Sequence, residues 1–157
     1  MRCIPSGVTF LILTSQCIQA RNFVAYFINW GIYGRNYQVT DIPFTMVTHI
    51  NYAFGNIGPG GQLILGDPYA DIDKAFPGDS WDTSVQPYRG NFWQLKKAKQ
   101  QYPQLKVLLS VGGWTWSGKF SDVASSPSSR QAFAASCKTF LDTYGFDGCV
   151  VICSLNV

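Results

Sequence analysis

KVLLSVGGW, residues 106–114, is the stretch of sequence that decides the fold. Its apolar run from Lys106 to Val111 predicts a short, buried β-strand. Gly112 and Gly113 follow at once, and two residues without a Cβ let the backbone turn sharply and leave room beside it. Trp114 then supplies a flat apolar ring, which suits a sugar ring, a base or a protein core.

Three further apolar runs predict strands on either side of this one. They are residues 23–28 (FVAYFI), 46–54 (MVTHINYAF) and 146–152 (FDGCVVI). Residues 55–90 form a connection rich in Gly, Pro and Asp, far longer than the ~4–6 residues of an ordinary loop. We interpret this connection as a wall of a cleft, with disorder as the alternative.

Two helices are predicted between the strands. Residues 92–102 carry an apolar face, and Pro103 ends the helix because the residue before a proline is pushed out of the helical region. The second helix has Ser126 as its cap and Pro127 in its first position, and it ends at Gly145. The residues expected to face inward are Phe92, Leu95 and Tyr102 in the first helix and Phe133, Cys137, Phe140, Leu141 and Tyr144 in the second.

Strands that alternate with helices predict an α/β fold with parallel strands and right-handed crossovers. An open doubly wound sheet and part of an eight-fold barrel both fit this order. The connection after the first strand, Asn29 to Gly34 (NWGIYG), is aromatic and lacks a glycine-rich phosphate loop. This absence favours the barrel, in which functional residues gather at the carboxyl ends of the strands.

Composition indicates a chain that folds around one core. Hydrophobic residues make up 46% of the 157 residues and charged residues only 13%, which excludes a disordered chain. The net charge of +3 is too small to predict a nucleic-acid partner. Lys96, Lys97 and Lys99 are best explained as the solvated face of a helix.

Residues 1–20 are predicted to be a secretory signal peptide. Arg2 is followed by the apolar run Val8 to Leu13 and by the small and polar residues Ser15 to Ala20. The run is far shorter than the ~20 residues that span a bilayer, so no membrane association is expected. A buried first strand is the alternative. We therefore expect a secreted, extracellular protein, with the cell wall as one location.

The cysteines do not predict a disulfide framework. Removal of the signal would leave Cys137, Cys149 and Cys153, and an odd number leaves at least one unpaired thiol. Cys149 and Cys153 on one strand would lie ~13 Å apart, too far for a bond. His49 is the only histidine and is expected to be structural, so no metal site is predicted.

Five segments, in order, resemble family 18 chitinases. Ser110 to Trp114 matches the SxGG signature at the end of the family's third strand, and Phe146-Asp147-Gly148 opens its second signature, DGxDxDWE, on the fourth. The remaining matches are Tyr26-Phe27 with Trp30-Gly31, Tyr52-Ala53-Phe54, and the stretch from Asp67 to Trp81, which is similar to the long loop of fungal members.

The resemblance implies the first half of a TIM (β/α)8 barrel, with about four parallel strands and intervening helices over residues 21–157. Family 18 enzymes hydrolyse β-1,4-linked N-acetylglucosamine polymers with retention, using the substrate's own acetamido oxygen as the nucleophile. Chitin or chitooligosaccharides are the implied ligands. No cofactor is implied, and a monomer is expected.

The resemblance also nominates substrate-binding residues. In the family, the SxGG serine and the first-strand tyrosine hydrogen-bond the first of the two aspartates that precede the acid glutamate. Each nominated residue has packing in the core or an ordinary strand exit as its alternative. The nominated residues are Tyr26, Phe54, Ser110, Gly112, Gly113 and Trp114.

The chain departs from the family inside the second signature. Val150 and Ile152 occupy the two aspartate positions, and Ser154 occupies the position of the acid glutamate. Only Asp147 remains of the four carboxylates, as a supporting catalytic residue. Loss of the general acid alone typically costs ~10²–10⁴-fold in rate, so we expect no hydrolysis.

Three interpretations stay open from the sequence. An active chitinase would need its second half from elsewhere. A chitin-binding, lectin-like module would use the aromatic cleft without the acid. A truncated product without function is the third, because four strands of an eight-stranded barrel leave two long edges uncovered.

Overall fold

The structure, a computed structural model, describes residues 21–154. The predicted signal peptide therefore lies outside the described residues. Four parallel strands form the sheet, with β3 (Leu63–Ile64) paired antiparallel to the end of the second strand. In their order across the sheet, the parallel strands are β1 (Val24–Ile28), β2 (His49–Ile57), β4 (Lys106–Gly112) and β5 (Gly148–Cys153).

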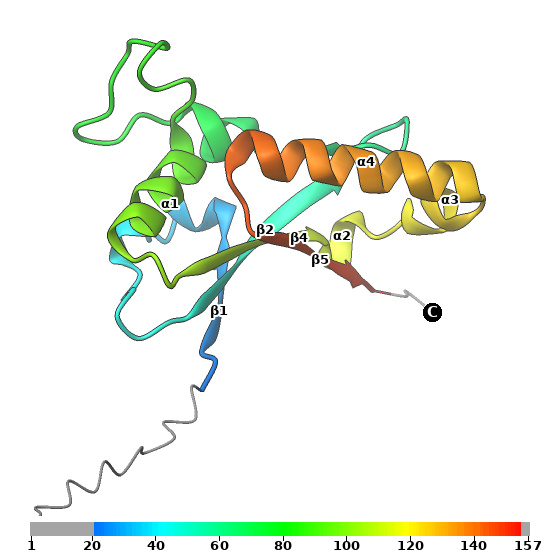
Figure 1. Cartoon of the computed structure of the whole chain (residues 1–157), viewed down its shortest axis with the longest axis horizontal. Helices are drawn as coiled ribbons and strands as arrows, with labels where there is room; N and C mark the ends of the chain where they lie inside the picture. Colours follow the sequence, from blue (N-terminus) through cyan, green and yellow to red (C-terminus); the bar gives the residue numbers. More distant parts are fainter. Residues whose placement is uncertain (1–20, 155–157) are drawn as a thin grey trace, which may run out of the picture.

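Two long helices lie on the same side of the sheet (Figure 1). α1 (Gly90–Gln101) crosses from β2 to β4, and α4 (Pro127–Tyr144) crosses from β4 to β5. No helix among residues 21–154 is long and apolar enough to cross a membrane. The shorter elements are η1 (Asn29–Ile32), η2 (Val39–Asp41), the π-helical turn η3 (Tyr69–Asp73), α2 (Gly113–Trp116) and α3 (Phe120–Ala124).

The predicted ends of α4 are confirmed. The Ser126 side chain accepts a hydrogen bond from the Ser129 amide, and Pro127 is the first helical residue. Gly145 ends the helix in the left-handed conformation, with φ of 79°. A side chain there would be strained, so the glycine sets the point at which the chain turns back towards the sheet.

The second strand was predicted three residues too early at both ends. A turn occupies Phe44 to Met46, where the Met46 amide donates to the Pro43 carbonyl, so β2 begins only at His49. It continues to Ile57 because its last two residues pair with β3. That pairing partner lies in the long connection, where no strand was predicted.

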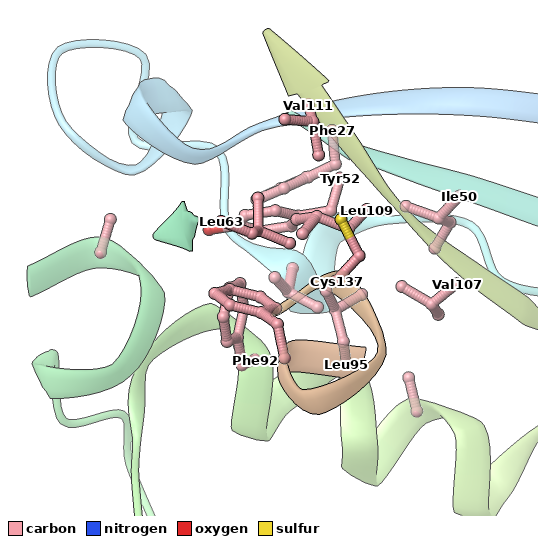
Figure 2. Packing of buried hydrophobic residues seen from close by; sticks show 14 of the residues in the cluster. Phe27, Ile50, Tyr52, Leu63, Phe92, Leu95, Val107, Leu109, Val111 and Cys137 are labelled. Atoms are coloured by element: carbon pink, nitrogen blue, oxygen red, sulfur yellow. The ribbon is translucent and has the colours of Figure 1, made fainter. Parts of the chain in front are cut away.

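The hydrophobic core lies between the sheet and the two long helices (Figure 2). Phe27, Tyr52, Leu109 and Cys149 are partners across the four parallel strands and form one row. The first three are buried, and Cys149 packs against the same cluster. From the helices, Phe92 and Leu95 of α1 and Cys137 and Phe140 of α4 complete the core.

The opposite face of the sheet carries the alternate rows, because successive side chains on a strand point to opposite faces. Ile28, Ala53, Ser110 and Val150 are partners in one such row. Tyr26 belongs to the neighbouring row, and 54% of its surface is exposed. Neither long helix covers this face, which corresponds to the interior of the predicted barrel.

Candidate functional site

The carboxyl ends of the parallel strands bring aromatic and glycine residues together. Trp30 follows β1 and stacks on Phe54 of β2, with ring centroids 6.1 Å apart. Gly113 follows β4 and lies against the same phenylalanine, since a Cβ on this glycine would come within 3.0 Å of the Phe54 ring. Gly113 also forms a β-bridge to Cys153 at the end of β5. Four strand ends therefore meet at one edge of the sheet.

Indole rings face solvent at this edge. Trp114 is 78% exposed and Trp30 is 46% exposed, while Phe54 is half-buried beneath the Trp30 ring. Nearby, Tyr33 stacks on Tyr69 with centroids 6.4 Å apart, and its hydroxyl donates to Asp67 at 2.8 Å. Exposed flat rings of this kind provide apolar faces that can stack on a ligand ring.

Gly112 cannot be replaced by another residue without displacing its neighbours. Its φ is 96°, in the region that favours glycine. A Cβ would lie 2.5 Å from the Phe120 ring and 2.6 Å from the Ile152 carbonyl oxygen. The room that the sequence predicted beside the two glycines is thus filled by Phe120, Ile152 and, at Gly113, Phe54.

Ser110 faces the position of the missing aspartate. It is fully buried, and its hydroxyl has no hydrogen-bond partner. Its partner on β5 is Val150, which offers only methyl groups. A buried hydroxyl without a partner is unfavourable by ~1–3 kcal/mol, and such groups are uncommon. The strand pairing therefore places a valine where a carboxylate would satisfy this serine.

Ser154 lies at the same edge as the aromatic residues. Its amide donates to the Ser117 hydroxyl at 3.0 Å. That hydroxyl in turn donates to the Gly113 carbonyl and lies 3.1 Å from the Ile152 carbonyl. Ser117 thus joins the turn after β4 to the end of β5, and Ser154, which the sequence predicts at the position of the acid glutamate, lies beside Gly113.

Asp147 lies at the opposite end of the sheet, before β5 begins. Its carboxylate accepts the Val107 amide at 2.8 Å and pairs with Lys99 of α1 at 2.8 Å. Burial alone would raise its pKa, but the hydrogen bonds from Lys99 and Val107 outweigh burial and hold the pKa below the usual value. Its contacts tie α1, β4 and β5 together, and they separate Asp147 from the aromatic edge.

Tyr26 lies in the middle of β1 and is not gathered with the aromatic residues at the strand ends. It lines a groove of about 480 Å³ along the edge of the sheet, together with Phe27, Ile28, Gly31, Arg35 and Tyr37. The side chains of Tyr26 and Ser110 point to the same face of the sheet, the one opposite the long helices, from strands separated by β2.

A buried polar cluster holds the long connection to the sheet, and the sequence did not reveal it. Asp71, in η3, is 1% exposed and accepts four hydrogen bonds. The donors are the Tyr52 hydroxyl at 2.5 Å, the Asn29 amide group at 3.2 Å, and the backbone amides of Gly66 at 3.1 Å and Asp67 at 3.0 Å. Asn91 of α1 donates to the same Tyr52 hydroxyl at 3.2 Å.

Burial raises the pKa of Asp71 to about 6, although the hydrogen bonds from Tyr52, Asp67 and Asn29 oppose that rise. The cluster attaches η3 to η1 and β2 and, through the Tyr52 hydroxyl, to α1. Trp116 adds a further contact, because its ring would lie 2.8 Å from a Cβ at Gly66.

Comparison with known proteins assigns the family. The model of glycosyl hydrolases family 18 matches residues 22–151. Chitinase A1 of Niallia circulans is 42% identical over 86% of this chain and 23% of its own length. Chitinase 1 of Aphanocladium album is 48% identical over 78% of this chain and 29% of its own length. The chain spans about a quarter of these relatives, and bacterial and fungal enzymes match alike, so the fungal type is not distinguished.

Solved structures agree on the fold. Chitinase ChiA74 from Bacillus thuringiensis superposes with a TM-score of 0.77 and 38% identity, over 85% of this chain and 27% of that one. Human YKL-39, described as a pseudo-chitinase with retained chitooligosaccharide binding, superposes with a TM-score of 0.63 and 25% identity, over 85% and 33%. The predicted first half of a TIM barrel is confirmed, and the chain belongs to glycosyl hydrolases family 18.

Proposed function

We propose that the described domain binds N-acetylglucosamine oligosaccharides or chitin at its aromatic edge and does not hydrolyse them. The family's activity has two parts, sugar binding and hydrolysis, which depend on different residues. Binding depends on exposed rings at the ends of β1, β2 and β4. Hydrolysis depends on carboxylates at the end of β5, and those positions hold other residues.

The main evidence against hydrolysis is the pairing of Ser110 with Val150. The serine hydroxyl is buried without a partner, directly across from a side chain that cannot accept a hydrogen bond. Glycoside hydrolysis requires a carboxylic acid to protonate the leaving oxygen. Ser154 offers an alcohol at that position, and an alcohol is far too weak an acid near neutral pH.

Binding is supported by the exposure of the aromatic rings. Trp114 and Trp30 present uncovered indoles at the edge where family members hold their substrates. Human YKL-39 is described as a pseudo-chitinase with retained chitooligosaccharide binding properties. A sugar-binding surface without the acid therefore has a precedent among the structural relatives.

Retention on chitin beads tests binding. We expect the protein to be retained, and we expect Trp114→Ala to weaken retention at least 10-fold, consistent with loss of a stacked ring. Phe23→Ala is the matched control, because Phe23 is a 58% exposed aromatic residue that precedes β1, at the end of the sheet opposite the aromatic edge. Equal retention of the two variants would refute the assignment of the aromatic edge.

A chromogenic chitooligosaccharide tests hydrolysis separately. We expect no release of the chromophore above the rate with buffer alone. Release that increases with protein concentration and is abolished by Ser154→Ala would overturn the proposal. The two experiments therefore test binding and hydrolysis independently of each other.

We further propose that residues 1–20 direct secretion and that the mature protein is an extracellular monomer. The short apolar run between Arg2 and the small, polar residues up to Ala20 supports export. The first residue of protein recovered from a culture medium tests this, with an amino terminus near Arg21 expected. An intact Met1 on secreted protein would contradict it.

A further inference from the structure

Two cysteines that are distant from the aromatic edge come together between α4 and β5. Cys137 lies on the inner face of α4 and is 9% exposed. Figure 2 shows its sulfur pointing from the helix towards Leu109. Cys149 of β5 is the cross-strand partner of Leu109, and it packs against the same core cluster.

The two thiols approach the same part of the core, since the Cys137 sulfur points towards Leu109 and Cys149 is the cross-strand partner of Leu109. Their interaction lowers the pKa of Cys149, although burial opposes that change, and it raises the pKa of Cys137, as burial also does. Cys149 is half-buried and thus the more accessible sulfur, whereas Cys137 is enclosed. Accessibility and acidity therefore both identify Cys149 as the thiol that reacts first.

We propose that Cys137 and Cys149 form a disulfide that ties α4 to β5. The other described cysteine does not compete for Cys149. Cys153 lies four residues further along the same strand as Cys149, ~13 Å away by strand rise, and it is exposed at the end of the sheet. Nothing in this proposal depends on carbohydrate binding.

The reaction needs a disulfide oxidant, for which oxidised glutathione is the probe. The Cys149 thiolate attacks one sulfur of glutathione disulfide, forming a mixed disulfide and releasing one glutathione thiolate. The Cys137 thiol then loses its proton and attacks Cys149 Sγ, and the second glutathione leaves. Two protein thiols lose two protons and two electrons, and one glutathione disulfide becomes two thiols.

The bond would stabilise the attachment of β5. Closing a loop of about 13 residues shifts the unfolding equilibrium by on the order of 100-fold towards the folded state. Rotation about the Cα–Cβ bonds must bring the two sulfurs to ~2.05 Å from each other.

Peptide mapping of the full chain tests the proposal. The reduced protein is incubated with glutathione disulfide, its remaining thiols are alkylated, and it is digested with trypsin. Cleavage after Arg130 and Lys138 places Cys137 in residues 131–138 and Cys149 in residues 139–157. We expect these two peptides to be linked, lighter by two hydrogen atoms than their sum, with Cys153 alkylated.

Two controls make the result specific. Cys153→Ser should leave the linkage intact, and Cys149→Ser should abolish it without producing a Cys137–Cys153 bond. In denaturing urea the preference for Cys137–Cys149 should be lost, because only the fold brings these residues together. Free Cys137 and Cys149 after native oxidation, or a native linkage of either residue to Cys153, Cys3 or Cys17, would overturn the proposal.

Discussion

Replacing Asp71 by asparagine is expected to destabilise the fold strongly. The Asp71 carboxylate accepts two side-chain donors on one oxygen and two backbone amides on the other. Asparagine keeps one acceptor oxygen, so one of these pairs of donors faces an NH₂ group. Each buried donor left without an acceptor costs ~1–3 kcal/mol, so the loss of two should lower the free energy of unfolding by about 2–6 kcal/mol.

That loss is a large part of the ~5–15 kcal/mol that typically separates folded and unfolded states. With a dependence on urea of ~2 kcal/mol per molar, the midpoint of unfolding should fall by about 2 M. Tryptophan fluorescence and circular dichroism at pH 7 measure the midpoint. Asp73→Asn is the matched control, because Asp73 lies in the same turn with an exposed side chain. Equal midpoints for the two variants would refute the reasoning.

Three further predictions concern stability. Because Asp71 has a pKa of about 6 in the folded protein against 3.8 ordinarily, it keeps its proton to higher pH when folded. The free energy of unfolding should therefore fall by about 2 kcal/mol as pH rises from 4 to 6, a slope absent in Asp71→Asn. Gly112→Ala should lower the unfolding midpoint far more than Gly34→Ala. Gly112 has a positive φ and no room for a Cβ beside Phe120, whereas a Cβ at Gly34 would meet no atom within 4 Å. Ser126→Ala should cost ~1 kcal/mol in urea titrations, since it removes the cap of α4.

Local signals in the sequence were sufficient to predict the regular elements. The cap, first proline and terminal glycine of α4 act within one or two turns, so the sequence predicted its ends correctly. The start of β2 was misplaced because the apolar Met46 belongs to a turn, and its end was misplaced because β3 extends the strand. Pairing with a two-residue strand leaves no periodic pattern to detect.

The residues of the candidate site were predictable only where they belong to a sequence motif. Gly112, Gly113 and Trp114 belong to one contiguous signature, and the structure gathers them with Phe54. The Asp71 cluster was missed because its partners at positions 29, 52 and 91 are scattered along the chain. The approach of Cys137 to Cys149 was missed for a related reason, since the helix and strand that carry them meet only after α4 packs on the sheet.

The salt bridge between Asp147 and Lys99 stabilises the fold at the end of the sheet opposite the aromatic edge, so protein engineering can treat the two ends separately. Asp147 and Ser154 lie seven residues apart along an extended segment, about 23 Å by strand rise. Stabilising mutations around Lys99 and Lys106, at the end of the sheet where β4 and β5 begin, can therefore be screened by thermal stability alone. Libraries aimed at ligand preference can be restricted to exposed residues of the aromatic edge such as Trp30 and Trp114, away from this salt bridge.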